Sequence, residues 1–416
     1  MSDQVRSFCE IKEFGKFLEK CLNQKVLDYT LKSLTKPGDN YGSIMQSVDV
    51  EVIGESDTEE SEILHLVSKT AVTNPYLIEI FQPAFTFVKE THFYSDIIPA
   101  IEIFETMKNV PKTDRIDAFI PCPGSRISLN PDASCADADA VLLLENIKFQ
   151  NYVNEDRHIG FDTETTMAIL KTLAQFHAHC IAIRRMQPEL FDAKISPYLK
   201  AVNLCPDDND TKLVDGLCNE LKFVDDLDPE FRIAIEEQLK ICDKFGRDTT
   251  RTADTPYTTI VHRDLWTNNI MIKKDDIDVS VIKVKIYDFQ LYFYQTFVCD
   301  LIFFLLTSVR SNDLTKHFKL FIRQYHLEFV NTMKLVNCPC DDYTFDKMWN
   351  EIKEKSKLEL YHSLFMIKVV AVDESETPLS LDDVTPDTFL TDESPSKAIL
   401  NRWKCILAIF KDNGLI

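Results

Sequence analysis

Strand-like and helical patterns occupy different parts of this 416-residue chain, and this separation constrains the fold more than any other feature. Apolar residues alternate with polar ones over residues 48–52, as on a half-buried strand, and residues 63–70 form a second strand candidate. A short apolar run at 141–144 is typical of a fully buried strand. Helical periodicity dominates afterwards. The sequence therefore predicts two lobes, a sheet-rich lobe over 1–144 and a helix-rich lobe over 145–416, within an α+β fold.

Three apolar stripes at helical spacing support the helix-rich assignment. Asp162, with Glu164 two residues later, is a candidate N-cap for the first of these helices. The stripes are Ile169, Leu173, Phe176 and Cys180; Phe318, Ile322, Tyr325 and Phe329; and Ile399, Trp403, Ile406 and Phe410.

Charge and cysteine content limit the surroundings and partners of the chain. Lys and Arg number 46 against 67 Asp and Glu, a net charge of −21, which opposes binding to nucleic acid or to an acidic membrane. The 12 cysteines are scattered without a disulfide framework or zinc spacing, so we expect them to be reduced. No apolar run approaches the roughly 20 residues that span a bilayer, and the N-terminus lacks a secretory signal pattern. These observations predict a cytoplasmic protein.

The residues most informative about chemistry lie at 261–270 and just beyond. His262 and Asp264 form a His-x-Asp triplet, and Asn269 follows five residues after Asp264. Asp288 ends a short apolar strand 24 residues after Asp264, an interval long enough for a β-hairpin. Phosphoryl transfer needs one carboxylate beside the attacking hydroxyl, and a second carboxylate with an amide oxygen to hold Mg²⁺ against the phosphates. The spacing therefore predicts a phosphoryl-transfer site.

A cation for the ATP phosphates is expected in the first third of the chain. Lys69 ends the strand candidate at 63–70. Glu90 shares a helical face with Phe87 and Tyr94, where a buried carboxylate would be costly without a partner. A Lys69–Glu90 ion pair would satisfy both groups and direct the ammonium at the phosphates.

Residues 36–43 are the candidate for a loop that covers the phosphates. Gly38, Asn40, Gly42 and Ser43 lie in this stretch, which has two glycines rather than the three of G-x-G-x-x-G. Backbone N–H groups can approach phosphates in such a loop, although a plain turn would look similar. No G-x-x-x-x-G-K-[ST] motif occurs, which excludes a P-loop NTPase.

These motifs together resemble the ecdysteroid kinase-like family, small-molecule kinases of the protein-kinase-like superfamily that are related to choline kinases and aminoglycoside phosphotransferases. The resemblance covers nearly the whole chain. Its segments are the opening loop 38–43, the helix 87–94, the hinge 142–146, the segment 262–271, the Asp-Phe-Gln triplet 288–290 and the segment 300–308. The resemblance implies a bilobal protein-kinase-like fold, with a small antiparallel-sheet N-lobe and a mostly helical C-lobe.

The resemblance also implies roles for the residues singled out above. Asp264 would be the catalytic base, Asn269 and Asp288 would hold Mg²⁺, and Lys69 with Glu90 would position ATP. In addition, backbone groups around Glu145 in the hinge would meet adenine. His262 and Asp300 would brace the catalytic loop rather than react.

One departure concerns Arg263, which stands where the family usually has Gly and gives the His-Arg-Asp of protein kinases. Only 12 residues separate Asp288 from Asp300 and no Ala-Pro-Glu follows, so no long activation segment fits and a protein kinase is rejected. Arg263 could instead pair with a nearby carboxylate. The sequence does not name this partner.

The function implied is ATP- and Mg²⁺-dependent phosphorylation of a hydroxyl on a small molecule, an ecdysteroid or a similar apolar alcohol or hydroxylated xenobiotic. Two alternatives stay open. One is a kinase of the choline or aminoglycoside type, whose cationic acceptor needs carboxylates. The other is a pseudokinase that serves as a binding module. The sequence does not indicate an oligomeric state.

Overall fold

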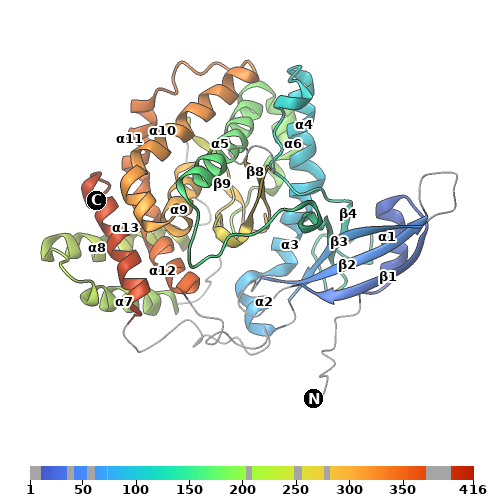
Figure 1. Ribbon diagram of the computed structural model, residues 1–416, viewed down its shortest axis with the longest axis horizontal. Helices are drawn as coiled ribbons and strands as arrows, with labels where there is room; N and C mark the ends of the chain where they lie inside the picture. Colours follow the sequence, from blue (N-terminus) through green and yellow to red (C-terminus); the bar gives the residue numbers. More distant parts are fainter. Residues whose placement is uncertain are drawn as a thin grey trace.

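The computed structural model describes residues 11–34, 42–53, 61–72, 74–202, 209–247, 255–275, 282–371 and 395–416. A sheet lies on one side of the molecule and most helices lie on the other (Figure 1). Within the described ranges, no helix is both long and apolar enough to cross a membrane.

The sheet has five antiparallel strands in the order β1-β2-β3-β5-β4. The strands are β1 (Val26–Ser33), β2 (Ser43–Ile53), β3 (Ser61–Ala71), β4 (Gly124–Arg126) and β5 (Val141–Glu145). The predicted strands at 48–52, 63–70 and 141–144 are thus confirmed as parts of β2, β3 and β5. The predicted lobe boundary after Leu144 falls within β5 and stays a prediction.

Alternation along β2 explains how the sheet acquires a buried face. The side chains of Val48, Val50 and Val52 are fully buried, and those between them are only partly covered. They pack with Phe14 and Leu18 of helix α1 (Phe14–Leu22), which therefore covers this face. Strand β1 was not predicted, although Leu27, Tyr29 and Leu31 alternate with polar residues along it; it is an edge strand, and most of its side chains are exposed.

The next helices run from the sheet into the helical region. They are α2 (Pro75–Phe81), α3 (Pro83–His92), a π-helical turn (Phe93–Ile97) and α4 (Ile98–Met107). Phe87, Glu90 and Tyr94 are all buried, as their predicted common face requires, although Tyr94 lies in the π-helical turn rather than in α3.

The rest of the chain is mostly helical and confirms the predicted α+β class. Its helices are α5 (Thr163–Met186), α6 (Pro188–Lys194), α7 (Asn209–Glu220), α8 (Pro229–Arg247), α9 (Val298–Ser308), α10 (Ser311–Leu335), α11 (Phe345–Lys355), α12 (Leu360–Ala371) and α13 (Lys397–Asp412). Asp162 caps α5 as predicted, because its Oδ1 accepts a hydrogen bond from the Thr165 N–H at 2.8 Å. All members of the three predicted stripes lie in or against the main core.

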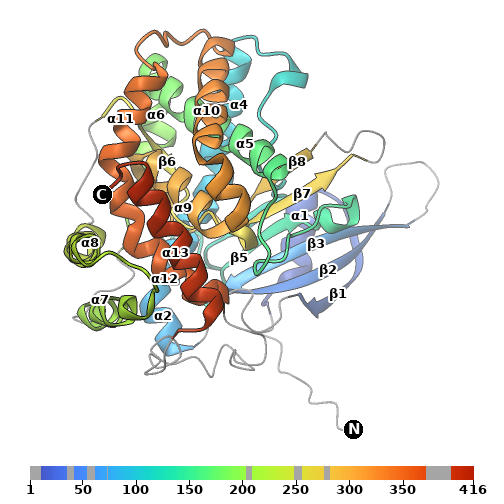
Figure 2. The ribbon, with the colours of Figure 1, turned by 60° about the vertical axis from the view of Figure 1, so that its left-hand side comes forward.

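Two antiparallel strand pairs flank the motif residues. One pairs β6 (Thr258–Val261) with β9 (Phe293–Thr296), and the other pairs β7 (Ile270–Lys274) with β8 (Ile282–Ile286). The second is the hairpin expected between Asp264 and Asp288. Figure 2 shows β7 and β8 beside the sheet, at the edge of the helical region.

Candidate active site

One fully buried carboxylate holds the backbone of the loop that follows β6. Asp300, near the start of α9, accepts hydrogen bonds from the backbone N–H of His262 at 2.6 Å and of Arg263 at 2.8 Å. His177 of α5 lies 3.2 Å from the same carboxylate. Since removing any of these partners would leave a buried polar group unsatisfied, the loop has one preferred position.

His262 links this loop to the segment that carries Asp288. Its Nδ1 accepts from the Asp264 N–H at 3.2 Å, so its Nε2 carries the proton and donates to the Tyr287 carbonyl at 2.9 Å. Burial lowers the pKa of His262, which favours this neutral form. These contacts agree with the bracing roles expected of His262 and Asp300, which themselves remain predictions.

Arg263 adopts a left-handed backbone conformation with φ of 71°. Glycine reaches this region without strain, which gives a physical reason for glycine at this position in the family. The guanidinium lies over the Phe293 ring, 5.0 Å from its centroid. No carboxylate in the described part of the chain lies within ion-pair distance of the guanidinium.

Asp264, Asn269 and Asp288 come together as the motif predicted. The Asn269 amide Nδ2 donates to the Asp264 carbonyl at 2.7 Å and to Asp264 Oδ2 at 3.0 Å. Because the nitrogen is committed to Asp264, the Asn269 amide oxygen is directed away from it. Asp288, in a left-handed conformation with φ of 68°, lies two residues after the end of β8.

Lys69 joins the sheet to this cluster. The predicted ion pair with Glu90 is present, with Nζ 2.6 Å from Glu90 Oε2, and Nζ also lies 2.7 Å from Asp288 Oδ1. Lys69 and Glu90 are almost fully buried. Burial alone would lower the pKa of Lys69, but the charges of Asp288 and Glu90 outweigh it and raise that pKa. Lys69 is therefore a fixed ammonium within the site.

The Asp264 carboxylate is held in a poorly solvated position. Burial and the negative charge of Asp288 raise the pKa of Asp264 to about 8, against the opposing hydrogen bonds of Asn269 and Trp266. A cation bound at Asp288 would lower the pKa of Asp264 and so favour the ionised carboxylate that a base requires.

Aromatic packing fixes the Asp-Phe-Gln triplet. Phe289 stacks on Phe93 of the π-helical turn, with centroids 3.6 Å apart and an interplanar angle of 8°. Phe289 is fully buried. A π-helical turn is rare and frequently lies near a functional site, and here it ties the helix of Glu90 to the segment of Asp288.

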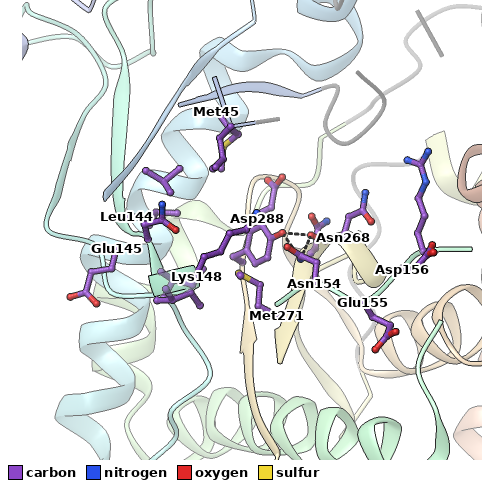
Figure 3. A pocket seen from close by; sticks show the side chains of 18 of the residues that line it. Met45, Leu144, Glu145, Lys148, Asn154, Glu155, Asp156, Asn268, Met271 and Asp288 are labelled. Carbon is purple, nitrogen blue, oxygen red and sulfur yellow. Dashed lines mark hydrogen bonds between the residues drawn. The ribbon is translucent and has the colours of Figure 1, made fainter. Parts of the chain in front are cut away.

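A pocket of about 420 Å³ opens beside these groups (Figure 3). This volume is in the range of small-molecule sites. Its lining combines strands, the hinge, the segment 154–158 and the motif residues: Leu34, Met45, Val67, Ile120, Leu144, Glu145, Asn146, Ile147, Lys148, Asn154, Glu155, Asp156, Arg157, His158, Asn268, Asn269, Met271, Tyr287 and Asp288. One wall is thus apolar, and the opposite end carries the Asn269 and Asp288 oxygens.

The hinge residue Glu145 lines this pocket, as expected, but its backbone N–H is already used. It donates to the Pro121 carbonyl at 2.9 Å, and the Asn146 N–H donates to the His65 carbonyl at 2.9 Å. A base in the pocket could not receive either of these hydrogen bonds.

Only the end of the candidate phosphate loop, Gly42 and Ser43, lies within the described residues. Gly38 and Asn40 lie outside the described residues. A side chain added at Gly42 would meet the amide of Gln290 at 2.5 Å, so the end of this loop lies against the Asp-Phe-Gln triplet. Ser43 is buried at the start of β2.

Sequence reasoning missed the pocket wall at 154–158. Asn154 Nδ2 donates to the Tyr287 hydroxyl at 3.0 Å and to the Ile270 carbonyl at 3.0 Å, which ties this wall to the motif hairpin. No local pattern marks it. The pocket residue Val67 could have been predicted. It lies two residues before Lys69 on the same strand, and side chains two residues apart on a strand share one face.

A second missed residue is Lys89, next to Glu90 on α3. It is 1% exposed, its Nζ donates to the Lys200 carbonyl, and the Tyr292 ring centroid lies 4.6 Å away. Of the three lysines buried in the described ranges, Lys69 and Lys285 have carboxylate partners and Lys89 has none. Burial, aided by the charge of Arg263, lowers the pKa of Lys89 to about 7.

The donor set fits Mg²⁺. Asn269 and Asp288 present hard oxygens to the pocket, and Mg²⁺ in nucleotide enzymes takes only one or two carboxylates beside water and phosphates. Within the described ranges, no group of three or more His, Cys, Asp or Glu side chains could hold a metal by itself.

A two-part fold with this lysine, glutamate, aspartate and asparagine arrangement defines the class of small-molecule kinases with a protein-kinase-like fold. The sequence pattern of the ecdysteroid kinase-like family matches residues 37–338, well over half of the chain. The chain belongs to this family.

Three solved structures to which this chain is similar are remote from it in sequence. Ethanolamine kinase of Plasmodium vivax is 12% identical, with 96% of this chain and 88% of that chain covered and a TM-score of 0.40. Amicoumacin kinase, solved in complex with AMP-PNP, Ca²⁺ and Ami, is 12% identical, with 95% of this chain and 93% of that chain covered and a TM-score of 0.39. Macrolide 2′-phosphotransferase of Brachybacterium faecium is 8% identical, with 91% and 98% covered and a TM-score of 0.35. The comparison with curated proteins gave no match.

Proposed function

We propose that this protein transfers the γ-phosphoryl group of ATP to a hydroxyl of a small molecule, with Mg²⁺ as cofactor. One observation carries the proposal: Asn269 and Asp288 both line the 420 Å³ pocket, Asn269 is bonded to Asp264, and Asp288 is paired with Lys69. A buried ammonium, two carboxylates and an amide oxygen are the groups that positioning and charge stabilisation in phosphoryl transfer require.

Each residue has a distinct part in this reaction. Asp264 accepts the proton of the acceptor hydroxyl as its oxygen bonds to phosphorus, and the bond between that phosphorus and the ADP oxygen breaks. Asn269 and Asp288 would hold Mg²⁺, which neutralises phosphate charge when bound. Lys69, kept charged by Glu90 and Asp288, pairs with the phosphates.

The acceptor we propose is a largely apolar alcohol of the ecdysteroid kind or a hydroxylated xenobiotic. Family membership supports this class. The chain also has 28 Phe and 13 Tyr, enough to build an apolar acceptor wall in addition to its core.

The test is an ADP-release assay with 20-hydroxyecdysone, ecdysone, choline, an aminoglycoside and a phenolic glycoside. We expect acceptor-dependent ADP release with the apolar alcohols, abolished in an Asp264→Asn control. Turnover of choline or the aminoglycoside alone would replace the proposed acceptor. No ATP consumption with any acceptor would favour the pseudokinase.

A further inference from the structure

The lining of the pocket carries more negative than positive charge. Among the described residues, four carboxylates and two basic side chains line it: Glu145, Glu155, Asp156 and Asp288 against Lys148 and Arg157. Lys69 does little to reduce this excess, because its ammonium already serves Glu90 and Asp288 at 2.6 and 2.7 Å. A nucleotide that brings phosphates into this pocket therefore needs a protein cation in addition to Lys69.

The two basic residues lie at different ends of the pocket. Lys148 is exposed and belongs to the 3₁₀ turn Ile147–Gln150, directly after the hinge strand. Arg157 is half-buried and belongs to the segment 154–158, on the side of the metal-ligand candidates. Figure 3 shows Glu145 and Lys148 on one side of Asp288, and Asn268 and Asp156 on the other. Arg157 is therefore the basic residue of the phosphate end.

Hydrogen bonds tie this segment to the motif hairpin. Asn154 Nδ2 donates to the carbonyl of Asn268 at 3.3 Å and to the hydroxyl of Tyr287 at 3.0 Å. Asn268 directly precedes Asn269, and Tyr287 directly precedes Asp288. The segment that carries Arg157 is thus fixed relative to both metal-ligand candidates.

The backbone around Arg157 is itself a hydrogen-bonded turn. The carbonyl of Asp156 accepts from the N–H of Ile159 at 3.0 Å and of Gly160 at 2.9 Å, and its Oδ1 accepts from the His158 N–H at 2.8 Å. Because the turn is formed before any ligand binds, a phosphate would not have to order this backbone.

The neighbours of Arg157 in sequence make its charge important. Glu155 and Asp156 line the same end of the pocket, and Asp288 lies across from them. If Arg157 were neutral, the segment 154–158 would present two carboxylates and no basic group with a permanent charge to a nucleotide. A guanidinium is always charged, and its planar set of donors matches two phosphate oxygens.

We propose that Arg157 is a phosphate-binding residue, and that its guanidinium pairs with the phosphate chain of the nucleotide. This proposal rests on the proposed function. It goes further by assigning a second protein cation for the phosphates, on a segment outside the motifs.

Titration calorimetry with Mg·ATP, Mg·ADP and adenosine tests the assignment without turnover. Arg157→Gln should weaken Mg·ATP binding about tenfold, near the lower limit for a hydrogen bond to a charged group because the side chain is half-buried. Adenosine affinity should stay within about twofold, which also shows that the pocket is intact. Arg157→Lys keeps the charge without the planar donors, and its loss should be smaller. A loss shared by Mg·ADP assigns the contact to the α- or β-phosphate, and a loss confined to Mg·ATP assigns it to the γ-phosphate.

Lys148→Gln is the matched control, because it removes the same charge from the hinge end of the same pocket. Its ratio of Mg·ATP to adenosine affinity should equal that of the wild type. Added salt should weaken Mg·ATP binding more in the wild type than in Arg157→Gln, since a pair of charges is screened in the first and absent from the second.

Two results would overturn the assignment while the proposed function stands. One is equal Mg·ATP affinity in the wild type and Arg157→Gln, and the other is an equal loss for Mg·ATP and adenosine, which would mean a distorted pocket. A wild type that binds no Mg·ATP would overturn the proposed function and this assignment with it. The two kinds of failure are therefore read from different proteins.

Discussion

Lys69 makes the contacts most open to a quantitative test, because one ammonium serves two carboxylates. Its Nζ lies 2.6 Å from Glu90 Oε2 and 2.7 Å from Asp288 Oδ1, and its side chain is 2% exposed. Lys69→Met leaves both carboxylates buried without a cation, which should cost about 3–5 kcal/mol of unfolding free energy. Glu90→Gln leaves Lys69 paired with Asp288, and should cost about 1.5–3 kcal/mol for one charged hydrogen bond.

The double variant Lys69→Met/Glu90→Gln removes the uncompensated charge at Glu90. Its destabilisation should therefore fall short of the sum of the single values by about 0.5–3 kcal/mol. Urea unfolding followed by circular dichroism measures all four proteins, and the KM for Mg·ATP should rise in each variant.

A double-mutant cycle at the ion pair of Lys404 and Asp226 serves as the matched control. This pair has a similar separation of 2.9 Å, but its side chains are 52% and 86% exposed, so its coupling should lie within experimental error. If the Lys69 and Glu90 effects were additive within about 0.5 kcal/mol, the two groups would not act as one unit and the reasoning would be refuted.

Three further outcomes are expected. Asp264→Asn should keep Mg·ATP affinity in titration calorimetry and lower kcat by roughly 10²–10⁴-fold, because an amide cannot accept the hydroxyl proton; turnover within a few-fold of wild type would contradict the assignment. Asp300→Asn should lower kcat with little change in KM for ATP, because it disturbs the backbone of the catalytic loop and leaves the pocket intact; an unchanged kcat would count against bracing. Lys89 has a pKa of about 7 in the folded state against 10.5 as its ordinary value, so the unfolded chain binds more protons between these limits and stability rises with pH there. Urea unfolding should show that the free energy of unfolding increases less between pH 7 and pH 9 for Lys89→Met than for the wild type. Equal increases would disprove the lowered pKa of Lys89.

Local periodicity was enough to predict several elements, because a side chain's burial repeats every two residues in a strand and every three to four in a helix. The alternation at Val48–Val52 predicted β2, and Asp162 predicted the start of α5 from its capping chemistry alone. The spacing of Asp264, Asn269 and Asp288 predicted a hairpin and a phosphoryl-transfer site, since those residues lie on one short stretch.

Contacts between distant segments were harder to predict. The Lys69–Glu90 pair was predicted because a carboxylate on an apolar face implies a cation. The contact of Lys69 with Asp288, 219 residues away, depends on how the sheet meets the β7–β8 hairpin. Similarly, the wall at 154–158 has no periodic signal, because it is irregular backbone.

The apolar cluster beside the catalytic loop shows most clearly what tertiary structure decides. In the sequence, Trp266 is one residue of a loop motif, and Met366 and Val370 form part of an ordinary apolar helix. Only the packing of α9 and α12 beside the loop brings these side chains together with Phe303. The sequence specifies which side chains are apolar, whereas the relative placement of helices far apart in the chain determines which of them pack together. A burial pattern shows that a face is covered and not what covers it.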